Sequence, residues 1–381
     1  MGSRSDQIAP KSLVASLVLS FLTASPLGTG ATVAAPAATR AYPVGERHLV
    51  TTDRTAALRD AQHRDQVPIT IWYPAASGAV ERPLDIGPPG HPYFRSGAAA
   101  PNAPFADSER RPIVLFSHGF GGSARMMAWF GTALARRGYL VVAVDHPGNN
   151  GANRMTLAGA LLFWERPADL AAALSRLELD PAIEAHIDPT RLAVAGFSAG
   201  GFTALAAAGG RVDIKRFRQF CKAHPNDGVC RPQAEFPVTS AEAKAFLGSP
   251  AMKVERRRSH RDLGIAGVKA VFVMAPAIVQ SFVPASLARI HVPVSIILGD
   301  ADKVVPPAAN GEAAAAMIPG AKIKILPGVG HYDFLAECTP AGNARIPICR
   351  TGISRARTHR QAIADALSLL NQTLGTPSIR R

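Results

Sequence analysis

Cysteine, charge and aromatic side chains are all sparse in this sequence. Its 381 residues include four cysteines, while 18% of the residues are charged and 6% are aromatic. A hydrophobic fraction of 47% beside so little charge is typical of a globular protein and excludes a disordered one. A chain of this length can bury a large core, and a single α/β domain of this size is ordinary.

A long hydrophobic run is also missing. The apolar stretch near the N-terminus, residues 13–22, is too short to span a bilayer, which takes about 20 residues. It follows Arg4 and Lys11 and precedes many small residues, a pattern that predicts an export signal with a short linker over residues 1–41. We therefore expect a mature domain, residues 42–381, in the periplasm or outside the cell, without a stable membrane span after signal removal.

Acidic residues are outnumbered, with 28 against 42 lysines and arginines and a formal net charge of +14. The excess is interpreted as a basic solvated surface, with an envelope surface or an anionic polymer as alternative partners. Because the sequence has no nucleic-acid-binding motif and no basic stripe interleaved with aromatic residues, we expect no nucleic-acid partner. The sequence does not determine the oligomeric state.

The four cysteines fall into two local pairs, Cys221 with Cys230 and Cys338 with Cys349. Each pair brackets a loop rich in proline, glycine or asparagine. An even number in an exported chain suggests two disulfides, and local pairing is the simplest of three possible connectivities. The spacing matches no tetrahedral zinc pattern, so we expect no metal site.

Continuous apolar runs alternate along the chain with segments of helical composition. Buried-type strands are predicted at residues 112–117, 139–144, 191–197, 268–274 and 292–298, after two earlier strands at 42–50 and 67–74 and before a last one at 322–326. Helices are predicted at residues 124–137, 167–179, 202–208, 308–317 and 354–374. Such alternation predicts the α/β class, with a mostly parallel sheet covered by helices on both faces.

Two segments interrupt this alternation. Residues 75–111 are rich in proline, glycine and alanine and are predicted to form one long loop. Residues 209–261 contain the first cysteine pair and several prolines, and we interpret them as a cap or lid inserted over the strand ends.

The stretch Gly196-Phe-Ser-Ala-Gly-Gly201 connects a predicted buried strand to a predicted helix. A G-x-S-x-G in that context is typical of a strained turn whose glycines allow strand and helix to approach closely. Ser198 is therefore the predicted nucleophile; the alternative is a tight turn that merely contains serine.

A serine nucleophile needs a base, and the base needs an orienting acid. The acid is predicted at Asp302, or with less support at Asp300, after the 292–298 strand. The base is predicted at His331, in a glycine-rich loop after the last strand. All three groups would lie at carboxyl ends of strands, where open α/β sheets build their sites.

The oxyanion formed by attack on a carbonyl needs preorganised donors. We expect these to be the backbone N–H of Ala199, directly after the nucleophile, and that of Phe120, in the loop after the 112–117 strand. His118 and His146 also end strands; His118 is assigned to shaping the oxyanion loop and not to proton transfer.

Several motifs together resemble the serine-type α/β-hydrolases, and among them the bacterial exported proteins described as predicted dienelactone hydrolases, akin to platelet-activating-factor acetylhydrolase. The motifs are Ile71-Trp-Tyr-Pro74, Ser117-His-Gly-Phe-Gly-Gly-Ser123, Asp145-His-Pro-Gly148, Arg166-Pro-Ala-Asp-Leu170, Gly196-Phe-Ser-Ala-Gly-Gly201 and Cys221 to Cys230. The resemblance implies the α/β-hydrolase fold and a carboxylic-ester hydrolase without metal or organic cofactor. One departure is that true dienelactone hydrolases use a cysteine nucleophile, so that label says little about the substrate.

The sequence thus predicts an exported serine hydrolase that cleaves a small-molecule or lipid-like ester through a Ser-His-Asp triad and an acyl-enzyme. Within hydrolases, the alternative is a polyester or lipid-ester hydrolase. From another class, the alternative is a non-catalytic binding protein of the same fold.

Overall fold

A computed structural model describes residues 41–377. The predicted export signal lies outside the described residues, except for its last residue. Among residues 41–377, no helix combines the length and apolar character that crossing a bilayer requires.

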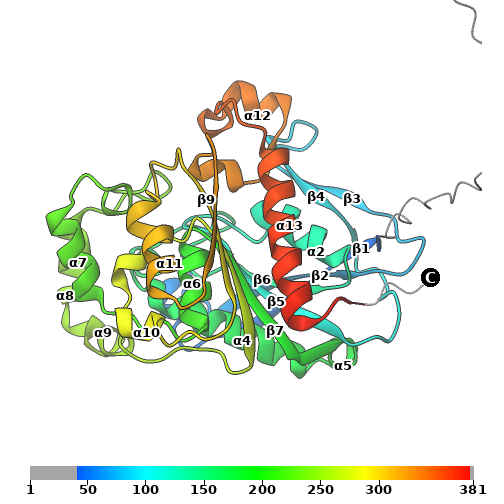
Figure 1. Cartoon of the computed structure of the whole chain (residues 1–381), viewed down its shortest axis with the longest axis horizontal. Helices are drawn as coiled ribbons and strands as arrows, with labels where there is room; N and C mark the ends of the chain where they lie inside the picture. The colour runs from blue at the N-terminus through cyan, green and yellow to red at the C-terminus, as the bar shows by residue number, and fades with distance from the viewer. Residues whose placement is uncertain (1–40, 378–381) are drawn as a thin grey trace, which may run out of the picture. The chain divides into compact units, whose positions relative to one another are not determined.

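The core of the fold is an eleven-stranded sheet (Figure 1). Its order is β10-β9-β8-β7-β5-β6-β2-β1-β4-β11, and β3 pairs with β4. The strands are β1 (Val44–Thr52), β2 (Gln66–Pro74), β3 (Arg82–Ile86), β4 (Phe94–Pro101), β5 (Arg111–Ser117), β6 (Leu140–Val144), β7 (Ile187–Phe197), β8 (Val268–Met274), β9 (Val294–Gly299), β10 (Lys322–Leu326) and β11 (Glu337–Cys338). The six neighbouring strands β10, β9, β8, β7, β5 and β6 pair in parallel, whereas β2 pairs antiparallel with β6 and with β1. The predicted mostly parallel sheet is confirmed.

Helices cover both faces of the parallel region. Because successive strand side chains point to opposite faces, Ile113 and Leu115 pack into one hydrophobic cluster and Val114 and Phe116 into another. The first cluster includes side chains of α4 (Arg166–Glu178) and α6 (Ala199–Ala207), and the second includes those of α2 (Ala128–Ala135) and α13 (Arg355–Leu374). Burial on both faces explains why β5 and β6 are apolar without alternation.

Shorter helical segments connect these elements. They are α1 (Ala56–Arg59), η1 (Arg125–Met127), α3 (Leu157–Leu161), η2 (Phe163–Glu165), α5 (Pro181–Glu184), η5 (Val279–Ser281), α10 (Pro284–Leu287), η6 (Ala308–Glu312), α11 (Ala313–Met317), η7 (His331–Phe334), α12 (Pro340–Arg345) and η8 (Pro347–Cys349). The helix expected over 308–317 is split, because its first part, η6, is π-helical and only α11 is α-helical.

The prediction of one long loop over residues 75–111 is wrong. That segment contains β3 and β4, which pair antiparallel, and β4 also joins the sheet beside β1. Its many small residues hide the strand pattern but allow close packing against α2: a Cβ on Gly97 would lie 2.6 Å from the Thr132 hydroxyl. Gly97 also has φ +100°, a conformation that favours glycine.

Residues 209–261, the predicted cap, lie between α6 and β8. They form α7 (Ile214–Ala223), η3 (Gly228–Cys230), α8 (Ser240–Gly248), η4 (Pro250–Met252) and α9 (Lys253–Arg258). In Figure 1, α7 and α8 lie together beyond one end of the sheet. As described, the segment adds helices and no strand to the sheet; its function as a cap stays a prediction.

Candidate active site

Ser198 occupies a sharp turn between β7 and α6. Its backbone has φ 56° and ψ −120°, a conformation that non-glycine residues adopt at a cost on the order of 1–3 kcal/mol. Neighbouring backbone holds it there: the Ser198 N–H donates to the Met274 carbonyl at 2.9 Å, and the Ser198 carbonyl accepts from the Ala277 N–H at 3.0 Å. The strained turn therefore is fixed by β8 and the segment that follows it.

The glycines around Ser198 are required by close backbone contacts. A Cβ on Gly196 would lie 2.1 Å from the Gly200 carbonyl oxygen, and one on Gly200 would lie 1.8 Å from the Ser117 carbonyl oxygen. A Cβ on Gly201 would lie 2.8 Å from Cα of Pro276. Any larger residue would push α6 away from β5 or β8, which explains the glycine pattern noted in the sequence.

The structure brings Ser198, His331 and Asp302 together at the carboxyl ends of β7, β10 and β9. The Ser198 Oγ lies 2.9 Å from His331 Nε2, and His331 Nδ1 lies 2.6 Å from Asp302 Oδ2. All three residues are nearly buried, with exposed fractions of 6%, 6% and 5%. A carboxylate on Nδ1 favours the tautomer in which Nε2 accepts the serine proton.

Both oxygens of the Asp302 carboxylate accept hydrogen bonds, whereas the Asp300 carboxylate binds a different part of the chain. The Asp302 Oδ1 accepts the N–H groups of Val304 and Val305 at 2.9 and 2.7 Å, which fixes the carboxylate toward His331. Asp300 instead accepts the Gly328 N–H at 2.6 Å and so braces the turn before the histidine loop. The geometry therefore favours Asp302 as the partner of His331.

Phe120 and Ala199, the predicted oxyanion residues, line the same cavity as Ser198. Ala199 is the first residue of α6, where N–H groups have no partner within the helix. The loop around Phe120 is held by its neighbours, because the Gly121 N–H donates to Asn149 Oδ1 at 2.9 Å and the Gly122 N–H to the Gly119 carbonyl at 3.1 Å. Within residues 41–377, neither the Phe120 nor the Ala199 N–H donates to a protein acceptor. Their role as oxyanion donors stays a prediction.

A second serine–histidine–aspartate relay lies under this loop, fully buried. His146 Nε2 lies 2.8 Å from Ser117 Oγ, and His146 Nδ1 lies 2.8 Å from Asp169 Oδ2. Asp169 also accepts two hydrogen bonds from the Arg59 guanidinium, at 2.6 and 2.8 Å. Burial lowers the pKa of His146 well below its ordinary value, and the nearby Arg166 and Arg59 charges lower that pKa further.

Arg166 connects this buried relay to the oxyanion loop. Its guanidinium donates to the His118 carbonyl and contacts Ser117 Oγ at 3.3 Å. Burial lowers the pKa of Arg166 to about 9. His118 is itself fully buried, with Nδ1 2.7 Å from the Gly119 carbonyl oxygen. The Arg166–Leu170 motif carries part of the resemblance noted in the sequence, but it assigned no role to Arg166 or Asp169. The available signal was that both charges precede the apolar stretch 170–174 of α4.

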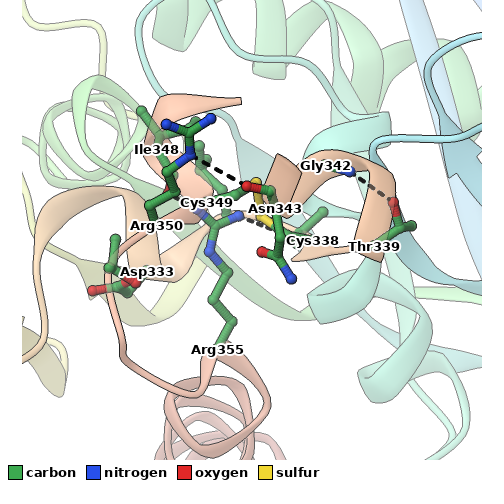
Figure 2. Close-up of a disulfide and its surroundings, with 12 residues drawn as sticks. Asp333, Cys338, Thr339, Gly342, Asn343, Ile348, Cys349, Arg350 and Arg355 are labelled. Atoms are coloured by element: carbon green, nitrogen blue, oxygen red, sulfur yellow. Dashed lines mark hydrogen bonds between the residues drawn. A yellow bond between two sulfur atoms is a disulfide. The ribbon is translucent and has the colours of Figure 1, made fainter. Parts of the chain in front are cut away.

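The two disulfides join Cys221 to Cys230 and Cys338 to Cys349, the local pairing. Figure 2 shows the second disulfide beside α12 and the buried Arg355. Arg355 donates to the carbonyls of Ala336 and Ile348, both at 2.6 Å, and so ties the ends of this cysteine loop together.

The segment that follows the second disulfide supports the histidine loop. Asp333 accepts the N–H of Gly330, next to His331, at 2.8 Å, and its other oxygen accepts the Thr351 hydroxyl at 2.6 Å. The position of His331 therefore depends on contacts made by residues 330–355, which the sequence did not reveal.

Two cavities meet at Ser198, and Phe120 lines both. The larger, about 560 Å³, lies against the predicted cap; Phe163, Phe217 and Leu247 are among its apolar lining residues. We call it the cap cavity. The smaller, about 400 Å³, is lined by His331 and by Ile346 and Ile348 of the second cysteine loop. An ester carbonyl placed at Ser198 would therefore have a separate space for the group on each side.

No group of three or more histidine, cysteine, aspartate or glutamate side chains within residues 41–377 is arranged to hold a metal ion.

The chain belongs to the alpha/beta hydrolase family, whose model matches residues 114–341. A curated relative is the protein named hydrolase acrC from Aspergillus aculeatus, 31% identical over 121 residues, or 32% of this chain. That match covers 28% of the fungal protein, so this chain spans less than a third of the relative's length. A solved structure of a ferulic acid esterase from Streptomyces cinnamoneus is similar in fold, with TM-score 0.58 and 23% identity over 91% of this chain and 94% of that chain.

Proposed function

We propose that this protein hydrolyses carboxylic esters, with Ser198 as nucleophile, His331 as general acid and base, and Asp302 as the residue that orients the imidazole. The observation that carries the proposal is the continuous Asp302–His331–Ser198 hydrogen-bond relay at a strained turn that opens into two cavities. Family membership supports the hydrolase class.

In the proposed first step, Ser198 Oγ forms a bond to the carbonyl carbon while its proton passes to His331 Nε2. The carbonyl oxygen becomes an oxyanion that accepts hydrogen bonds from the Phe120 and Ala199 N–H groups. The carbon–oxygen bond to the alcohol then breaks, and the alcohol leaves with the proton from His331. Water then attacks the acyl-enzyme and gives its proton to His331. The bond between the acyl carbon and Ser198 Oγ breaks, Oγ takes the proton back from His331, and the acid is released.

The resemblance to exported dienelactone-hydrolase-like proteins and the two disulfides support export of the mature chain, with residues 1–41 as the signal and linker. We propose residues 42–381 as one hydrolase domain, with residues 209–261 as its cap. A second candidate, a lipid-ester or polyester hydrolase, is favoured by the aromatic and aliphatic lining of the cap cavity.

The test is the turnover of p-nitrophenyl butyrate by the mature chain and by Ser198→Ala. We expect the variant to fold and to lose roughly 10⁴–10⁶-fold in kcat. Ser368→Ala, at an exposed serine of α13, is the matched control and should keep the full rate. A fluorophosphonate probe should label the native protein and not Ser198→Ala. Undiminished turnover of Ser198→Ala would contradict the mechanism; a folded native protein that takes no label would favour the binding-protein alternative.

A further inference from the structure

The cap cavity is apolar in its walls but carries four basic side chains, which we call the cap cations: Arg218, Lys222, Arg231 and Lys244. They come from three places, α7, the residue after η3, and α8. All four are exposed, and none forms an ion pair with an acid among the described residues. The Arg231 guanidinium donates to the neutral Asn226 side chain at 3.5 Å.

The acidic residues of the same segment are directed to other partners. Asp213 and Asp227 accept N–H groups at the starts of α7 and η3, and Glu242 accepts from Thr239 in the cap of α8. Glu235 accepts the Tyr332 hydroxyl at 2.9 Å, beside the smaller cavity. No aspartate or glutamate of the described chain lines the cap cavity.

The fold holds the cap cations close enough together for their charges to repel one another. Arg218 and Lys222 are four residues apart on α7, where like charges repel. Lys222 and Arg231 each follow a cysteine of the Cys221–Cys230 disulfide, so this crosslink holds two cation-bearing segments together. An anion in the cavity would relieve repulsion that the protein itself leaves uncompensated.

We propose that the cap cavity selects esters that carry an anionic group, a carboxylate, sulfonate or phosphate, on an apolar chain or ring. The apolar body lies against Phe163 and Phe217, and the cap cations bind the anion near the cavity mouth. This substrate class rests on the proposed function, because the ester bond must reach Ser198. A neutral ester of the same size gains the apolar contacts but not the charge interaction.

The experiment compares two esters with equal acyl chains, mono-p-nitrophenyl suberate and its neutral methyl ester. We expect the native protein to prefer the anionic ester in kcat/KM at low salt, and 0.5 M sodium chloride to reduce the preference because salt screens exposed charges. An analogous pair, naphthyl butyrate with and without a ring sulfonate, tests the alcohol side. The absence of a preference in both pairs would overturn the proposal.

Substitution of single cap cations tests whether the preference for the anionic ester arises in the cap cavity. Each of Arg218→Gln, Lys222→Gln, Arg231→Gln and Lys244→Gln should lower kcat/KM for the preferred anionic ester about two- to fivefold, the range of exposed ion pairs, and leave its neutral counterpart within about twofold. The matched control is Lys215→Gln, an exposed lysine of α7 that does not line the cavity. An equal loss in Lys215→Gln would assign the preference to overall charge and overturn the site.

A binding measurement separates failure of this inference from failure of the proposed function. Calorimetry on Ser198→Ala should show decanoate binding more tightly than decanamide, and the preference should fall in Arg218→Gln. If no ester is cleaved but decanoate is preferred, the anion site stands and the esterase proposal fails. If neutral esters are cleaved without a charge preference, the esterase proposal stands and the anion site fails. Binding of the cap cations to phosphatidylglycerol vesicles alone, without preference among dissolved ligands, would overturn the proposal in favour of membrane docking.

Discussion

Two serine–histidine–aspartate relays lie at the ends of the neighbouring strands β5 and β7. In the buried relay, Ser117, His146 and Asp169 are joined by distances of 2.8 and 2.8 Å; in the cavity relay, Ser198, His331 and Asp302 are joined by 2.9 and 2.6 Å. Hydrogen-bond lengths alone therefore do not distinguish them.

Their surroundings do. The buried relay has no exposed surface, and its serine is an ordinary strand residue that also contacts Arg166. The cavity relay reaches two cavities, and its serine has φ 56° beside N–H groups without protein acceptors. Access from two cavities, and not hydrogen-bond length, therefore supports the cavity relay as the proposed nucleophilic site, and we infer that the buried relay serves the fold.

Substitution of the aspartate in each relay should distinguish the two relays most clearly. Asp302→Asn should lower kcat on p-nitrophenyl butyrate by about 10⁴-fold, because the amide no longer holds His331 in the required tautomer. The thermal midpoint should change little. Steady-state kinetics beside a thermal melt measure both quantities, and a loss under tenfold would contradict the role of Asp302.

Asp169→Asn should instead act on stability. It removes the closest carboxylate partner of the buried Arg59, which keeps only its pair with Asp53, and it removes the negative charge that favours protonated Arg166. Removal of one partner from a buried ion pair costs about 3–5 kcal/mol of unfolding free energy. Urea unfolding measures the cost. Glu184→Gln, which breaks the exposed pair with Arg110, is the control and should cost at most about 1 kcal/mol. Equal costs would mean that the buried relay is not structural.

Acid should destabilise the fold through three buried histidines, of which His146 belongs to the buried relay. Burial lowers the pKa of His146 and of His118 well below 6.5, and lowers that of His359 to about 3. These histidines bind protons in the unfolded chain below about pH 6.5 but not in the folded one, so their contribution is complete above pH 6.5 and is lost as pH falls. The slope approaches about 1.4 kcal/mol per pH unit for each histidine.

Urea unfolding at pH 7.5, 6.5, 5.5 and 4.5 measures that slope. His146→Gln should reduce it by about one histidine's share, whereas His91→Gln, at an exposed turn, should not. An unchanged slope in His146→Gln would show that this histidine titrates alike in both states.

The smallest effect is expected from Ser117→Ala. It removes one hydrogen bond to His146 and the contact with Arg166, at a cost of about 1–2 kcal/mol in unfolding free energy. The folded variant should keep kcat within about tenfold, in contrast to Ser198→Ala. A loss comparable to that of Ser198→Ala would reverse the assignment of the two relays.

Much of the fold and of the cavity relay could be predicted because their signals are local. The apolar runs of β5, β6 and β7 reflect burial on both faces, and glycines mark the turn at Ser198. Chain order then placed an acid and a histidine after later strands of the same sheet, and the structure joins Asp302 and His331 to Ser198.

The rest depends on contacts between distant residues. The partner of Asp169 is Arg59, 110 residues away, and nothing in either local pattern announces the pair. The strand β4 is built of small residues that resemble a loop, and its packing against α2 becomes visible only in three dimensions. The wall formed by Ile346 and Ile348 likewise depends on how the second cysteine loop folds back.

The two disulfides carry a practical consequence for anyone producing this protein. Each crosslinks a segment that lines a cavity, α7 with η3 and β11 with η8, and neither joins two strands of the parallel region. Material made in a reducing cytosol would lack the crosslinks in both cavity walls. Because the proposed substrate preference depends on the wall of the cap cavity, a thiol count belongs beside the activity in the quality control of such a preparation.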